Sequence, residues 1–198
     1  MIRSSSLITA ITAIALCVGC VHSPTVDNHG IPTNANKASE TEVYRKFLDN
    51  WIESEKTESI SVAMEAEEPS PKKIEQFSDC AREDNTTTPH WLPAKSISDL
   101  SDIVGKLPYV RLVDSNKWEP HDPGELISQG QSVESAVKDG FAGGLLTFSA
   151  ITFDESYETA AFAYSFICGR LCGNGAIVIY RKTQSGWVQS KHCGDWIS

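Results

Sequence analysis

The sequence predicts an α+β fold in which an antiparallel C-terminal β-meander of about four strands packs with N-terminal and central helices. Phe162, Tyr164 and Phe166 alternate with smaller residues, a pattern typical of a strand with one face on a core. The connections between the C-terminal strands are too short for a crossover, which makes neighbouring strands antiparallel. Further upstream, apolar residues recur at helical spacing.

Four segments make up the predicted meander, and short turns join them. The strands are expected at residues 145–153, 160–168, 176–180 and 187–192. Turns are expected at the glycine-rich residues 173–175 and at residues 183–186. Such a sheet needs a covering layer, so we expect helices on one of its faces.

The first helix is predicted to begin near Ser39, which has the spacing of a capping box with Glu42. Its apolar stripe consists of Val43, Phe47, Leu48, Trp51 and Ile52. A strand is expected at residues 59–64. Further helices are expected at 73–80, 97–104 and 131–141, and another strand at 109–113.

The charge of the chain limits its partners. The 198 residues, enough for one ordinary domain, include 17 basic and 26 acidic side chains and give a formal net charge of -9. Nucleic-acid binding needs clustered Lys and Arg, so we expect no nucleic-acid partner. Adhesion to anionic lipid through a basic surface is disfavoured for the same reason.

The amino terminus has the organisation of an export signal. Arg3 precedes an uncharged apolar run over residues 7–18, which is too short for a comfortable membrane span but fits a signal peptide. The run ends in Leu16-Cys17-Val18-Gly19-Cys20, which resembles the lipobox of bacterial lipoproteins. The resemblance implies cleavage after Gly19 and attachment of diacylglycerol, with further acyl chains such as palmitate, to Cys20.

Two alternatives to lipidation stay open. Cys17 stands where lipoproteins more often have Leu, which leaves ordinary signal cleavage, and an uncleaved anchor is the other alternative. Two or more acyl chains give stable attachment, so a lipidated Cys20 predicts a membrane anchor. Val21, in place of Asp, resembles an address at the periplasmic face of the outer membrane.

These signals divide the chain into three parts. Residues 1–19 are expected to be the signal peptide, and residues 20–38 the lipidated cysteine and a flexible tether rich in Pro, Asn and Thr. Residues 39–198 are expected to form a single α+β domain.

Four cysteines remain after Cys17 and Cys20. Their even number in an exported chain predicts two disulfides, and we favour Cys168–Cys172 and Cys80–Cys193 among three connectivities. The chain-entropy model assigns about 2 kcal/mol to the short loop and about 4.8 kcal/mol to the long one. A zinc site from Cys168, Cys172, His192 and Cys193 is the weaker alternative, since C-x3-C is not the usual spacing and adjacent strand residues point to opposite faces.

The C-terminal stretch 166–198 carries a resemblance of its own. Its Cys168-Gly169-Arg170-Leu171-Cys172-Gly173-Asn174-Gly175 segment, Gly186-Trp187 and terminal Trp196-Ile197-Ser198 are similar to a group of uncharacterised exported bacterial proteins. The resemblance supports the meander and implies no activity.

Few residues are candidates for chemistry. The turn with Gly169, Arg170, Gly173 and Gly175 could bind an anion through backbone amides, but we favour glycines that adopt positive φ beside a disulfide, because the turn joins two strands and opens no helix. No serine-hydrolase elbow, metalloprotease helix or P-loop is present, and we expect no metal and no cofactor.

The sequence therefore favours a non-enzymatic envelope lipoprotein that binds an envelope protein or component. An envelope hydrolase that uses His121 or His192 with nearby carboxylates is the second hypothesis, and a zinc-binding module is the third. A histidine facing a carboxylate inside a pocket would favour the enzyme.

Overall fold

The computed structural model describes residues 33–82, 88–94 and 97–198. The expected signal peptide, Cys17, Cys20 and tether residues 21–32 lie outside these ranges. Within them, no helix is both long and apolar enough to cross a membrane.

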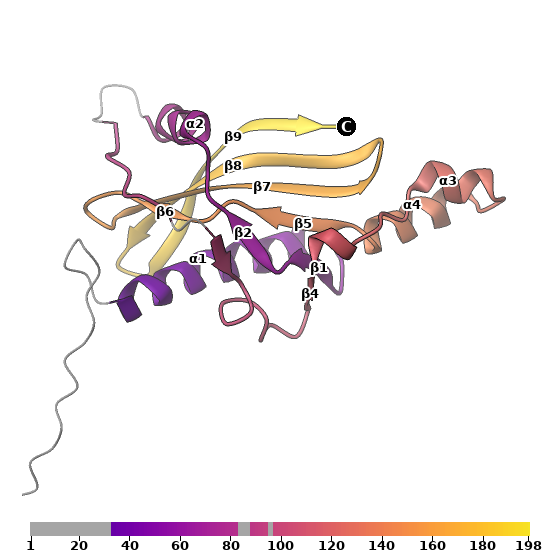
Figure 1. The fold of residues 1–198 in the computed structure, drawn as a ribbon, viewed down its shortest axis with the longest axis horizontal. Coiled ribbons are helices and arrows are strands. Elements are labelled where there is room, and N and C mark those ends of the chain that lie inside the picture. Colours follow the sequence, from indigo (N-terminus) through magenta and orange to yellow (C-terminus); the bar gives the residue numbers. More distant parts are fainter. Residues whose placement is uncertain (1–32, 83–87, 95–96) are drawn as a thin grey trace, which may run out of the picture. The chain divides into compact units, whose positions relative to one another are not determined.

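A mixed sheet forms the centre of the fold (Figure 1). In the described residues it contains seven strands in the order β4-β1-β5-β7-β8-β9, with β6 paired to β7. The strands are β1 (Ile60–Ala63), β4 (Val110–Val113), β5 (Leu145–Phe148), β6 (Thr152–Phe153), β7 (Thr159–Gly169), β8 (Cys172–Thr183) and β9 (Gly186–Ile197).

The sheet is larger than the predicted four-stranded meander. The antiparallel series β5-β7-β8-β9 has the expected character, but β1 adds to β5 and β4 adds to β1 in parallel. Parallel pairs need crossover connections. The chain supplies one between β1 and β4 through β2 (Glu65–Glu67), α2 (Pro71–Ala81) and β3 (Ile97–Asp99).

Helices cover both faces of the sheet, which confirms the α+β class but not the single covered face. The long helix α1 (Thr33–Glu55) lies on one face and the short helix α2 lies on the other (Figure 1). Phe162 and Phe166 of β7 join the α1 core, whereas Ala161 belongs to the smaller α2 core with Phe77. This division follows from the alternation of side chains along a strand.

Two smaller helices stand at one end of the sheet. The helices α3 (Pro123–Ser128) and α4 (Val133–Ala142) lie beside the turn between β7 and β8 (Figure 1). The expected helix at 131–141 corresponds to α4, whereas α3 and the 3-10 turn η1 (Ser115–Lys117) lie where no helix was predicted.

The first helix begins earlier than predicted, at Thr33, so residues 33–38 of the expected tether are helical. Ser39 therefore lies inside the helix and not at its start. The carboxylate of Glu42 accepts a hydrogen bond from the backbone N–H of Trp187 at 3.0 Å, so it stabilises a tertiary contact with the start of β9.

The predicted helix at 97–104 was wrong. Ile97–Asp99 form β3, which pairs antiparallel with β2. The Asp99 carboxylate accepts a hydrogen bond from the Ser101 backbone N–H at 2.8 Å and starts a turn instead of a helix. Leu100 and Val104 are still fully buried, so the apolar spacing reflected burial and not regular helix.

The predicted turn at 173–175 was also wrong, because these residues lie inside β8. The chain turns at Arg170 and Leu171, between the paired residues Gly169 and Cys172. The expected strand 145–153 is split into β5 and β6, since residues 149–151 leave the main ladder.

Candidate functional site

A cleft of about 550 Å³ lies between α1 and the strands β7, β8 and β9. We call it the α1 cleft. Its lining consists of Phe47, Asn50, Trp51, Ser54 and Glu55 from α1, together with Tyr164, Val178, Gln189, Ser190, Lys191 and His192 from the strands. A cavity of this size that combines aromatic and polar side chains has the properties of a ligand site.

His192 lines the α1 cleft and lies close to two other polar side chains. Its Nε2 lies 3.3 Å from the hydroxyl of Tyr164, and its Nδ1 lies 3.4 Å from a carboxylate oxygen of Asp195. The imidazole and phenol rings are parallel within 1°, with centroids 6.1 Å apart. The side chains of β7 and β9 thus form a phenol–imidazole–carboxylate series.

Helix α1 supplies the apolar wall of the cleft. The Trp51 ring meets the Tyr164 ring edge-on at 5.4 Å, and Phe47 also contacts that ring. Trp51 is 6% exposed, and its indole N–H is buried with no hydrogen-bond partner among the described residues. These packed rings hold the Tyr164 hydroxyl in a fixed position.

The surroundings of Tyr164 favour the protonated form of its hydroxyl. Burial raises the pKa of its hydroxyl, and the negative charges of Asp195 and Glu55 raise it further. The phenol is therefore a hydrogen-bond donor at neutral pH. An imidazole between a carboxylate and a hydroxyl can exchange a proton with a bound ligand, but no Ser, Thr or Cys among the described residues forms a hydrogen bond with His192.

His121, the other histidine of the hydrolase hypothesis, has a different environment. It forms no ion pair or hydrogen bond with the residues that the structure describes, and its ring lies against Gly143. The adjacent carboxylate of Asp122 points to the β7–β8 turn. Of the described histidines, His192 is thus the one that lines a cavity and also lies near a carboxylate, that of Asp195.

The predicted anion-binding turn faces a carboxylate of its own chain. The Arg170 backbone N–H donates to Asp122 Oδ2 at 2.7 Å, while Asp122 Oδ1 caps α3 by accepting from the N–H groups of Gly124 and Glu125. The Arg170 hydrogen bond is the main reason that the pKa of Asp122 is held below its usual range. Asp122 therefore occupies the position at this turn that an external anion would need.

Gly173 and Gly175 have a separate role on the opposite side of the sheet from α1. A Cβ atom at Gly175 would lie 2.4 Å from Nε1 of Trp196, and one at Gly173 would lie 3.4 Å from the same ring. The two glycines make room for the indole, so they do not belong to the turn.

The four described cysteines form the two favoured pairs. Cys80 of α2 pairs with Cys193 of β9, and Cys168 pairs with Cys172 across the β7–β8 turn, with Cα–Cα distances of 5.9 and 5.1 Å. These distances are ordinary for disulfides. The zinc hypothesis needs the same thiols as ligands, and over the described ranges no group of three or more His, Cys, Asp or Glu side chains could hold a metal ion.

Comparison with known protein families, curated proteins and solved structures gives no match for this chain. Sequence reasoning found His192 but missed Tyr164, Trp51 and Asp195 as its neighbours. The only local indication was Gly194 between His192 and Asp195, a residue that often marks a bulge in a strand.

Proposed function

We propose that this chain is an exported bacterial lipoprotein, anchored through Cys20, whose folded part is a non-enzymatic binding module. The leader and its resemblance to a lipobox support export and lipidation. The observation that carries the proposal is that all four cysteines after Cys20 lie in disulfide pairs, because such pairs persist in oxidising compartments outside the cytosol.

The proposed location is the periplasmic face of the outer membrane, as Val21 implies. The helical residues 33–38 shorten the proposed tether to the residues before Thr33. The folded part would stay near the membrane surface and meet an envelope protein or another envelope component there.

The α1 cleft is the proposed ligand site of the module. It offers one donor that stays protonated at neutral pH, Tyr164, beside an imidazole and an aromatic wall. These features favour recognition of a ligand by hydrogen bonds and ring contacts.

Membrane attachment is tested with Cys20→Ser in the native host. We expect the wild-type chain to incorporate labelled palmitate and to sediment with membranes, whereas the variant loses the label and appears in the soluble envelope fraction. A control variant, Ser23→Ala in the same segment, should behave as the wild type. Unchanged labelling or sedimentation of Cys20→Ser would overturn the lipid anchor.

A second candidate function is acid–base catalysis in the α1 cleft. The observation that favours it is the position of His192 between Asp195 and the Tyr164 hydroxyl. Hydrolysis of p-nitrophenyl acetate by wild-type and His192→Asn chains separates the two functions. A binding module shows the same slow background for both, and a saturable rate that disappears in His192→Asn would establish the enzyme instead.

A further inference from the structure

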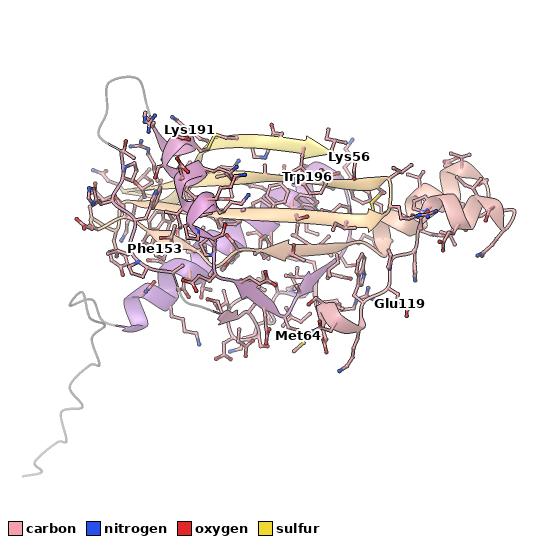
Figure 2. The ribbon with its side chains drawn as sticks, turned by 45° about the horizontal axis from the view of Figure 1, so that its top comes forward. Lys56, Met64, Glu119, Phe153, Lys191 and Trp196 are labelled. Carbon is pink, nitrogen blue, oxygen red and sulfur yellow. A yellow bond between two sulfur atoms is a disulfide. The ribbon has the colours of Figure 1, made fainter. Side chains whose placement is uncertain are left out.

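The sheet face opposite α1 carries a second groove, which goes beyond the ligand site proposed above. Helix α2 covers only part of this face (Figure 2). Under it, Phe77 forms a buried cluster with Ala161, Ile177 and Ile179. Beyond α2 lie two adjoining cavities of about 530 and 480 Å³. They share four lining residues, Lys73, Ala163, Tyr164 and Trp196, and so form one continuous groove, which we call the Trp196 groove.

Trp196 forms an aromatic platform in this groove. Its side chain is 41% exposed, although it lies directly over the glycines of β8. The ring approaches both Gly175 and Gly173, which places it against the sheet, and part of it remains exposed. Figure 2 labels Trp196 on this side of the sheet. Its indole N–H forms no hydrogen bond with the described residues, and the exposed part of the ring is available to a ligand.

The remaining floor is flat and weakly polar. Ala163 and Ser165 of β7 and Thr147 of β5 contribute small side chains, none of which rises above the sheet as a bulky residue would. A floor of this kind suits an extended chain and leaves room for long side chains at its margins.

The groove has a pronounced negative charge at its β2 end. Glu65, Glu67 and Glu68 line it and are exposed, and none of them forms an ion pair with a described residue. Lys73 is the only basic residue among the described residues that line either cavity. Because carboxylates of one sign in a concave surface concentrate the field there, the groove attracts cations.

The negative charge of the Trp196 groove also limits which molecules can bind there. A second copy of this chain, with a net charge of -9, would be repelled by the carboxylates. A cationic side chain can lie over the exposed face of an indole, the aromatic ring that binds cations best, and can pair with the carboxylates nearby. We propose that the Trp196 groove binds an extended basic segment of a partner protein, with a Lys or Arg side chain over Trp196 and a second one near Glu65 and Glu67.

The test uses the full-length oxidised chain in mild detergent and the probe peptide acetyl-Gly-Lys-Gly-Arg-Gly-Lys-Gly-amide. Each of the five tryptophans gives one indole N–H signal in a ¹H–¹⁵N NMR spectrum, and Trp196→Phe identifies the signal of Trp196. We expect that signal to shift saturably on titration, and the apparent affinity to fall as salt increases.

Charge variants make the result specific. Glu65→Gln/Glu67→Gln/Glu68→Gln should weaken binding at least tenfold, whereas Glu53→Gln/Glu58→Gln/Glu134→Gln removes the same charge at exposed positions elsewhere and should leave it within twofold. The proposal is overturned if the Trp196 signal does not shift, if both triple variants weaken binding equally, or if a neutral N-acetylglucosamine oligomer shifts that signal at lower concentration. These outcomes do not depend on Cys20 or on the α1 cleft.

Discussion

Cys193 and Trp196 project from the same face of the sheet, although they are three residues apart on one strand. Cys193 pairs with Ile177, whereas Trp196 pairs with Gly175, so three steps on β9 match two on β8. Gly194 has a φ of +68°, which identifies a bulge with a glycine in the left-handed region. The extra residue turns Trp196 toward the glycines of β8 and brings Asp195 to His192 on the other side of the strand.

We predict that Gly194→Ala destabilises the fold by about 1–2 kcal/mol, since left-handed backbone is costly for a residue with a Cβ. Urea unfolding measures the loss. Gly130→Ala is the matched control, because Gly130 has a φ of +95° and open space around it. Both variants should lose stability, but only Gly194→Ala should move the Trp196 and His192 NMR signals. If both signals stay in place, the bulge does not position these side chains.

The bulge in β9 is also the feature of this part of the fold that the sequence does not predict. Alternating Phe162, Tyr164 and Phe166 predicted β7 correctly, because a half-buried strand leaves a period of two. A one-residue bulge has no such pattern, so the predicted last strand ended at His192 while β9 continues to Ile197. The parallel pairing of β1 with β4 and β5 depends on contacts distant in sequence and could not be read from local spacing.

The candidate site, too, was predictable from the sequence only in part. His192 and the cysteine pairs followed from residue type and number, whereas Trp51 appeared only as part of an apolar helix face. Its place in the α1 cleft depends on how α1 packs on the sheet, which periodicity does not specify. The glycine-rich sequence around residues 173 and 175 predicts a turn. Their role in making room for Trp196, about 20 residues later in the chain, leaves no local pattern that the sequence could show.

The two disulfides are predicted to contribute unequally to stability. Cys80–Cys193 closes a loop with a sequence separation of 113, and Cys168–Cys172 closes one of 4. In the chain-entropy model their removal costs about 4.8 and about 2 kcal/mol. Urea unfolding of Cys80→Ser/Cys193→Ser and Cys168→Ser/Cys172→Ser provides the comparison. Equal losses, or a larger loss for the short loop, would contradict this ranking.

Asp122 is predicted to make stability depend on pH in the acid range. Its pKa is lower in the folded chain than the ordinary value of 3.8, so its contribution is fully present well above that value. The contribution disappears as the pH falls below 3.8 toward the folded pKa. Asp122→Asn should therefore flatten the decline in unfolding free energy that follows when the pH falls below about 5. A decline as steep as in the wild type would show that the Arg170 contact is not formed.

The carboxylate of Asp195 is predicted to influence the titration of Tyr164. Burial is the main cause of the raised pKa of Tyr164, and Asp195 is the next. Asp195→Asn should lower that pKa without restoring its ordinary value, because burial remains. NMR of chain labelled with ¹³C-tyrosine follows the titration, and Glu134→Gln serves as a distant control. An unchanged Tyr164 pKa in Asp195→Asn would place the carboxylate away from the α1 cleft.

Intact-mass and peptide analysis of the protein, extracted from its native membranes with a thiol-blocking reagent present, tests the central proposal most directly. We predict an N-terminal peptide that begins at acylated Cys20, and no blocked thiol at Cys80, Cys168, Cys172 or Cys193. An unprocessed chain that begins at Met1 and carries four blocked thiols would contradict export, lipidation and the disulfide pairs together.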